Sequence, residues 1–310
     1  MARQKHLSLV VHTFISIKLT FYMLTRLSFF FLAAAVAVPV SAEEIRIAAS
    51  DLLADFILEP LQAYGKEHSI DFQFDSIGSL PALDRLRSDE IDLAIIAVPE
   101  NTDTPRDEFR IFPFAYDVAI VAVNDSNPID EISMSKLGGI FGSDEELNYT
   151  AWGDLGLSGW GNRSIKPLAG QSDASISLEL FKFSVLRGGQ MKTTVAEVKD
   201  SEVEGLLVSD AASIAILPRL PTNKKVKALM ISSEADGPAF GPTDDNVHYG
   251  DYPIRLAFYV VYNQRGEERV KEVLRVLMSD EVSDSLRENH MFALPDTVRR
   301  KLTIDLDLGK

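Results

Sequence analysis

The 310-residue sequence contains no cysteine. An exported protein without cysteine has no disulfide framework, no thiol nucleophile and no residue after a signal peptide that could carry a lipid. If this chain is exported, we therefore expect it to be free in a bacterial periplasm or secreted, rather than anchored by a lipid.

Histidine is scarce as well, and phosphate-binding glycine motifs are missing. After residue 42 the only histidines are His68, His248 and His290, which are far apart in the sequence. They do not have the spacing of a metal site or of a Ser-His-Asp catalytic set. Neither the dinucleotide-binding pattern nor the P-loop pattern of glycines occurs. The sequence predicts no cofactor, no bound metal and no catalytic centre.

Positive charge is in short supply. The chain has 31 basic and 46 acidic residues, a net charge of −15. The first 42 residues hold four basic residues and no acidic one, so the remainder carries a net charge of −19. Nucleic acids and anionic membrane surfaces bind to basic patches, so this charge balance excludes both as expected partners.

The first 42 residues have the composition of an export signal. Basic residues precede an apolar run at 27–38 that is too short to span a membrane comfortably, and Val40-Ser41-Ala42 supplies small residues for signal peptidase. We predict cleavage after Ala42. The alternative is an uncleaved anchor that uses the apolar residues 10–22.

The rest of the chain has an α/β pattern and is long enough for two domains. Residues 45–49 predict a strand, Ser50-Asp51 predict the cap of a following helix, and 92–98 predict a strand buried on both faces of a sheet. Long β-rich runs at 116–124 and 253–263 enclose a second α/β block. We expect two doubly wound α/β domains, 43–118 plus 251–310 and 119–250, joined by these two runs as crossover strands.

Further elements are predicted within and after this block. The patterns favour helices at 134–141, 150–155, 202–207, 267–278 and 281–290, strands at 211–217 and 226–231, and a loop at 247–252.

The segment 165–181 (IKPLAGQSDASISLELF) combines a strand, a loop of small polar residues and the start of a helix. Such a join places backbone N–H groups and the positive end of a helix dipole together, which suits an oxyanion. The alternative is an ordinary helix start capped by Ser172, Asp173 or Ser175. Similar Ser- and Asp-containing joins occur at Ser50-Asp51 and at Gly78-Ser79. In open α/β sheets these joins lie where small ligands bind.

Six segments share their order and spacing with a known family. They are 137–142 (LGGIFG), 152–156 (WGDLG), 163–167 (RSIKP), 210–216 (DAASIAI), 246–253 (NVHYGDYP) and 289–295 (NHMFALP). Over nearly all of residues 43–310 the chain resembles the substrate-binding protein of the bacterial phosphate-specific ABC importer, a type II periplasmic binding protein. This resemblance implies a monomer that binds a small ligand between two domains and delivers it to an ABC permease.

The ligand motifs of that family are only partly present. Ser50, Ser79, Ser175 and Ser177 match family positions that bind the ligand, and Asp51 lies in the turn after the first strand. Gln171 stands where the family has an arginine. The run at 96–98 (IAV) lacks the aspartate that the family places after its third strand. Gln171 offers one neutral amide where arginine offers a charged planar fork, so binding of a buried dianion should be weaker.

The resemblance implies that Ser50, Asp51, Ser79, Gln171, Ser175 and Ser177 bind phosphate or a related small polar ligand. Two alternatives remain. One is a ligand-sensing or envelope interaction protein with the same fold and a degenerate cleft. The other is an enzyme that uses Asp51 or Asp173 as acid or base, although no nucleophile–base pair is visible in the sequence.

Overall fold

The computed structural model describes residues 43–99, 102–143, 146–172 and 175–308. The predicted signal peptide and its cleavage site, residues 1–42, lie outside this range, as does Asp173. Residues Glu43–Lys310 form one compact unit. Among the described helices, none combines the length and apolar character needed to cross a lipid bilayer.

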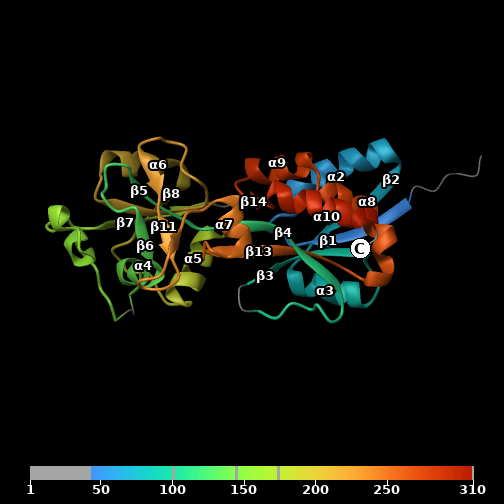
Figure 1. Cartoon of the computed structure of the whole chain (residues 1–310), viewed down its shortest axis with the longest axis horizontal. Helices are drawn as coiled ribbons and strands as arrows, with labels where there is room; N and C mark the ends of the chain where they lie inside the picture. Colours follow the sequence, from blue (N-terminus) through green and yellow to red (C-terminus); the bar gives the residue numbers. More distant parts are fainter. Residues whose placement is uncertain (1–42, 100–101, 144–145, 173–174, 309–310) are drawn as a thin grey trace, which may run out of the picture. The chain divides into compact units, whose positions relative to one another are not determined.

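The first and last parts of this unit build a six-stranded mixed sheet with the order β14-β4-β13-β3-β1-β2. β3 is parallel to β1, whereas β13 is antiparallel to both β3 and β4. In Figure 1 the helices α2, α8, α9 and α10 gather on one face of the sheet and α3 lies on the other. The strands are β1 (Glu43–Ala49), β2 (Ile70–Ser76), β3 (Leu93–Val98), β4 (Arg110–Val118), β13 (Arg255–Tyr262) and β14 (Phe292–Ala293). The helices are α2 (Ala54–His68), α3 (Ser79–Arg87), α8 (Glu267–Leu277), α9 (Asp280–Glu288) and α10 (Asp296–Leu308).

The intervening part of the chain builds a five-stranded sheet, β10-β5-β9-β7-β8, and a three-stranded sheet, β12-β11-β6. The five-stranded sheet consists of β5 (Ile120–Asn124), β7 (Lys166–Gln171), β8 (Ala196–Lys199), β9 (Ser213–Leu217) and β10 (Val226–Ala228). The smaller sheet consists of β6 (Glu131–Ser133), β11 (Met230–Ser232) and β12 (Ala239–Phe240). The helices are α4 (Met134–Phe141), α5 (Ser177–Leu186), α6 (Asp200–Ser209) and α7 (Asp244–Tyr249), with short 3₁₀ turns η1 (Trp152–Leu155), η2 (Ser158–Trp160) and, after β13, η3 (Gln264–Gly266).

The apolar runs of the sequence become the central strands of both large sheets. β3 is buried along nearly its whole length between β1 and β13, as its unbroken apolar sequence predicts. All five residues of β9 are buried between β5 and β7. The expectation of an α/β fold is confirmed, with the refinement that both large sheets are mixed.

The chain passes between the two large sheets at two adjacent points. β4 ends at Val118 in the first sheet and β5 begins at Ile120 in the second, while the return path leads through Tyr252 into β13. The Ala119 N–H donates to the Ile254 carbonyl at 3.1 Å, and the buried Tyr252 hydroxyl donates to the Ala119 carbonyl at 2.8 Å. We call these two bonded strand-to-strand connections the crossing. The division into domains 43–118 plus 251–310 and 119–250 stays a prediction.

Four predicted elements differ from the structure. Residues 247–252, expected as a loop, contain the second half of α7, whose first turn is capped by the Thr243 side chain. The run 116–124 is interrupted at Ala119, where the chain changes sheet, and 226–231 is divided between β10 and β11 of different sheets. The helix expected at 150–155 is the 3₁₀ turn η1. In each case the competing influence is tertiary pairing or a side-chain cap, which local hydrophobic periodicity does not report.

Candidate functional site

The turn between β1 and α2 is held together by Ser50. Ser50 is buried, its N–H donates to the Ile95 carbonyl at 2.8 Å, and its own carbonyl accepts from Leu53 and Ala54 at 3.1 and 3.0 Å. Its hydroxyl accepts from the Leu52 N–H at 3.5 Å. The N-cap of α2 is Leu53, without a side-chain cap, so the prediction that Ser50 or Asp51 caps this helix is wrong. The chain makes an additional turn at residues 51–53, so α2 begins only at Ala54.

The turn between β7 and α5 is arranged similarly. α5 begins at the buried Ser177, and the Ser177 N–H donates to the Ser175 hydroxyl at 3.1 Å. The N-cap position is occupied by Ile176, so neither Ser172 nor Ser175 takes the N-cap position expected of them. Ser175 nevertheless satisfies one of the backbone donors that a helix start leaves unpaired.

A buried carboxylate lies beside this turn. Asp117, the penultimate residue of β4, is only 6% exposed, and it accepts N–H bonds from Val118 at 2.8 Å and from Ile176. Burial raises the pKa of Asp117 to about 6, against the opposing effect of these two N–H groups. Asp117 thus connects the end of a strand in the first sheet with the start of a helix beside the second sheet.

These three features surround one cavity of about 330 Å³, which we call the solute pocket. Its walls come from the β1–α2 turn, from the first turn of α2, from β4 and from the β7–α5 turn. The lining residues are Asp51, Leu52, Leu53, Asp55, Phe56, Asp117, Ser175 and Ile176. β1, β4 and β7 all approach the pocket with their carboxyl ends, which is where α/β proteins bind small ligands.

Of the six predicted ligand residues, Asp51 and Ser175 line the solute pocket and the other four do not. Ser50 and Ser177 are buried within the two turns. The Ser79 hydroxyl accepts the Ala97 N–H at 2.9 Å and so attaches the start of α3 to β3. Gln171 is exposed and donates to Glu197 at 2.6 Å. The ligand roles of all six residues remain predictions.

Sequence reasoning missed Asp117. The signal available was a single carboxylate within the otherwise apolar end of β4, FAYDV at 114–118, every residue of which is buried. A charged residue in such a run needs hydrogen-bond partners or a functional reason for its burial. Without the fold, nothing in the sequence places Ile176 beside it.

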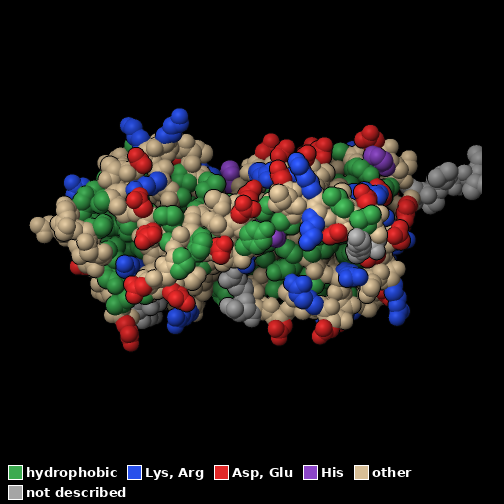
Figure 2. Space-filling model, in the orientation of Figure 1, with side chains coloured by type: hydrophobic (Ala, Val, Ile, Leu, Met, Phe, Trp, Pro, Cys, Tyr) green, Lys and Arg blue, Asp and Glu red, His purple; other side chains and the backbone are tan. Residues whose placement is uncertain are grey.

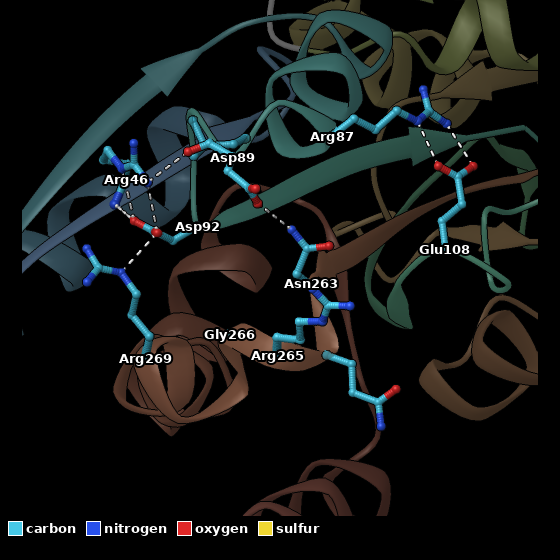
Figure 3. Close-up of a pocket in the computed structure, with 11 residues that line it drawn as sticks. Arg46, Arg87, Asp89, Asp92, Glu108, Asn263, Arg265, Gly266 and Arg269 are labelled. Atoms are coloured by element: carbon cyan, nitrogen blue, oxygen red, sulfur yellow. Dashed lines mark hydrogen bonds and ion pairs between the residues drawn. The ribbon is translucent and has the colours of Figure 1, made fainter.

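A second, larger cavity of about 880 Å³ lies at the opposite edge of the first sheet, where β1 and β3 begin and β13 ends. Figure 3 shows two groups of ion pairs at its sides, with Asp89, Asn263 and Arg265 between them. In one group, Asp92 accepts from Arg46 at 3.0 Å and from Arg269 at 2.9 Å.

In the other group, Arg87 donates to both carboxylate oxygens of Glu108, at 2.9 and 3.1 Å.

Burial works against ionisation of Asp92, but the hydrogen bonds from Arg46 and Arg269 outweigh it and hold the pKa of Asp92 below its ordinary value. The Asp92 pairs attach β1 and α8 to the residue before β3, and the Arg87–Glu108 pair attaches the end of α3 to the segment before β4, so we interpret both groups as structural.

Outside the two cavities, the visible face of the molecule carries charged side chains of both signs (Figure 2). Figure 2 shows acidic and basic side chains interspersed over the visible face. Within the described ranges, no group of three or more histidine, aspartate or glutamate side chains is arranged to hold a metal ion.

The fold agrees with the comparison to known families. A family model described as "PBP superfamily domain" matches residues 34–281. The chain belongs to the PBP superfamily. This is a family of binding proteins rather than enzymes, so the enzymatic alternative with Asp51 or Asp173 as acid or base is set aside.

Among characterised relatives, the chain is similar to protein SphX of Synechococcus elongatus, with 25% identity over 70% of this chain and 66% of that protein. It is similar to the phosphate-binding protein PstS of Pseudomonas aeruginosa, with 24% identity over 63% of this chain and 64% of that protein. The matches thus span slightly less than two thirds of each relative's own length.

Among solved structures, PstS from Borrelia burgdorferi aligns with a TM-score of 0.67 and 18% identity, covering 82% of this chain and 99% of that one. At this identity the agreement establishes the fold alone. PBP superfamily members share an architecture, and the site decides what each of them binds.

Proposed function

We propose that this protein is an exported solute-binding protein that captures a small polar ligand in the solute pocket and presents it to an ABC permease. The observation that carries this proposal is the lining of the pocket. Asp51 lies in the β1–α2 turn and Phe56 in α2, both beside the first sheet. Ser175 and Ile176 lie in the β7–α5 turn beside the second sheet, and Asp117 lies next to the crossing. A ligand in this position contacts both parts of the chain at once.

Contacts to both parts give the ligand a means to change the conformation. A ligand shifts a conformational equilibrium only as far as its affinities for the two states differ. If residues 43–118 plus 251–310 move against 119–250 about the crossing, a ligand held from both sides stabilises the closed state. A permease that recognises the closed state then distinguishes loaded from empty protein.

The names of the relatives make phosphate the reference ligand for this pocket. The residues of this chain support weaker binding of doubly charged phosphate than in a protein with the full family motif. Gln171 stands at the arginine position, and its amide donates to Glu197 outside the pocket. We therefore propose a small polar ligand and keep phosphate as one member of the panel to be tested.

The same proposal implies the compartment in which the protein acts and its oligomeric state. With residues 1–42 removed after export, the protein acts in the periplasm or is secreted, as a monomer. Its high negative charge disfavours nucleic acid and anionic membranes as partners.

The test is a thermal unfolding series on the exported protein with phosphate, sulfate, molybdate, amines, amino acids and neutral sugars, followed by calorimetric titration of each compound that stabilises it. A ligand at one hundred times its dissociation constant adds about 2.7 kcal/mol to the free energy of unfolding. We expect Ser175→Ala to weaken the response and the exposed Ser158→Ala, outside the pocket, to leave it unchanged. If no compound, including solutes extracted from the native host, stabilises the protein, solute capture is wrong.

A second candidate function is ligand sensing or envelope interaction without transport. It is favoured by the engagement of Ser79 with Ala97 and of Gln171 with Glu197, which removes two expected ligand residues from the pocket. Uptake of a labelled ligand by cells with and without the gene separates the two. Binding in vitro without any change in uptake would favour this second function.

A further inference from the structure

We infer that the ligand of the solute pocket is a small organic cation, an amine protonated at neutral pH, and that Asp51, Asp55 and Asp117 receive its ammonium group. This inference rests on the proposed function, because it names the ligand class of the same pocket. It departs from the oxyanion that the similarity to phosphate-binding proteins suggests.

The charge of the lining is the first observation. Asp51, Asp55 and Asp117 contribute three carboxylates, and none of the described residues that line the cavity is a lysine, arginine or histidine. A doubly negative oxyanion would be repelled by all three and would lose hydration without a compensating positive charge. A cation would be attracted by the same three groups.

The second observation concerns hydrogen-bond donors, which an oxyanion requires. At the β1–α2 turn the N–H groups of Leu52, Leu53 and Ala54 already donate to Ser50. At the β7–α5 turn the N–H of Ile176 donates to Asp117 and that of Ser177 to Ser175. These five backbone donors, of the kind that strand–loop–helix joins usually offer to an anion, are therefore engaged within the protein.

Acceptors, in contrast, are available. Within the described part of the chain, the carboxylates of Asp51 and Asp55 have no hydrogen-bond or ion-pair partner, and both residues are exposed. Asp117 accepts two N–H groups, fewer than the roughly four hydrogen bonds that a carboxylate can accept. A ligand that donates hydrogen bonds from a positive group complements this arrangement.

The helix dipoles do not reverse this preference. α2 directs its positive end toward the pocket, but Asp55 lies in its first turn, and α5 likewise carries Glu179 in its first turn. A full negative charge at this position more than offsets the partial positive charge of about one half at a helix start.

The remaining walls fit the carbon part of such a ligand. Leu52, Leu53 and Ile176 are apolar, and the half-buried Phe56 adds an aromatic ring to the lining, a group that attracts an ammonium placed over its face. The volume of about 330 Å³ is near the lower end of ligand pockets, which favours a small molecule over a peptide.

The experiment is calorimetric titration of the exported protein with pairs of ligands that differ only in the charged group. The amines are phenethylamine and 1,4-diaminobutane, their neutral counterparts are phenethyl alcohol and 1,4-butanediol, and the anions are phosphate and sulfate. We expect each amine to bind at least tenfold more tightly than its alcohol, with affinity falling as salt is added. Neither anion should compete with the amine.

Variants assign the effect to the pocket. Asp51→Asn combined with Asp55→Asn should reduce amine affinity at least tenfold without changing the melting temperature of the free protein substantially, because both side chains are exposed. The matched control is Asp236→Asn, an exposed carboxylate outside the pocket, which should leave affinity unchanged.

The outcomes separate this inference from the proposed function. Binding of phosphate or of a neutral polyol, abolished by a pocket variant, would overturn the cation inference and leave solute capture standing. Equal affinities for amine and alcohol would do the same. Failure of every compound and of host extracts to bind would overturn both.

Discussion

At the scale of single residues, Asp117 and Asp92 are both aspartates with low exposure, but their surroundings differ. Among the described residues, the partners of Asp117 are backbone N–H groups, and its pKa is raised to about 6 by burial. Asp92 is surrounded by guanidinium groups and its pKa is lowered. The charged form of Asp117 is therefore disfavoured by folding, whereas that of Asp92 is favoured.

Replacement of Asp117 should change how stability depends on pH. Because the folded-state pKa lies above the unfolded one, the folded state binds more protons between about pH 4 and 6. The contribution of Asp117 to stability therefore falls as the pH rises through this window. We expect the difference in unfolding free energy between wild type and Asp117→Asn to vary across pH 4–6 and to be constant above pH 7. Urea unfolding at each pH measures it, and a pH-independent difference would contradict the assignment.

Replacement of Asp92 should have the opposite pH signature. Its lowered pKa means that its contribution is present above the unfolded pKa and is lost as the pH falls through the folded one. We expect Asp92→Asn to lower the unfolding free energy at pH 7 by about 1–2 kcal/mol, since Arg46 and Arg269 are partly exposed and solvent screens the pairs. The deficit should shrink in acid. Glu59→Gln, at an exposed site in α2, serves as control and should stay within about 0.5 kcal/mol of wild type.

At the scale of elements, two helix glycines illustrate how packing overrides propensity. A Cβ at Gly65 in α2 would lie 2.6 Å from the Ile70 carbonyl oxygen, whereas a Cβ at Gly205 in α6 would meet nothing within 4 Å. Gly65 therefore permits the close approach of α2 to β2, and Gly205 has no such role.

The same substitution at these two positions should have opposite effects. Gly205→Ala should stabilise the protein by about 0.5–1 kcal/mol through helix propensity alone. Gly65→Ala should destabilise it, by about 1–3 kcal/mol, because the backbone must shift to relieve the contact. Thermal and urea unfolding of both variants measure this, and stabilisation by Gly65→Ala would show that α2 can move away from β2 at little cost.

The sequence patterns predicted the positions of strands and helices better than they predicted which groups each side chain contacts. The apolar run at 92–98 identified β3, and two of the three Ser-containing joins lie at the solute pocket, while their role as a ligand site stays a prediction. The pattern could not show that Ser79 bonds to Ala97 or that Gln171 bonds to Glu197, since each partner is brought close only by the fold. The α7 helix was missed although Thr243 followed by two aspartates is a typical helix start.

At the scale of the whole molecule, the crossing is where the two large sheets depend on each other. Tyr252 is fully buried, and its hydroxyl donates to the Ala119 carbonyl at 2.8 Å. Burial raises the pKa of Tyr252, so the hydroxyl remains a neutral donor over the whole working range of pH. The bond joins the outgoing connection to the returning one.

Removal of this hydroxyl should therefore weaken the whole unit rather than one turn. We expect Tyr252→Phe to lower the unfolding free energy by about 1–3 kcal/mol, because the Ala119 carbonyl is left buried without that partner. Tyr249→Phe, at an exposed tyrosine nearby in the sequence, is the control and should change little. Small-angle X-ray scattering with and without ligand would show whether the variant also alters closure, and an unchanged stability would mean that the bond is dispensable.

The hydrogen bond between Ala119 and Ile254 has a practical consequence for protein engineering. It places the two ends of the segment 120–253 next to each other, so this segment is topologically an insertion into the six-stranded sheet. A linker of a few glycines could replace it and leave every strand of that sheet in order. Conversely, the excised segment could be closed into a ring, or a fluorescent reporter could be spliced at the junction to convert occupancy into an optical signal.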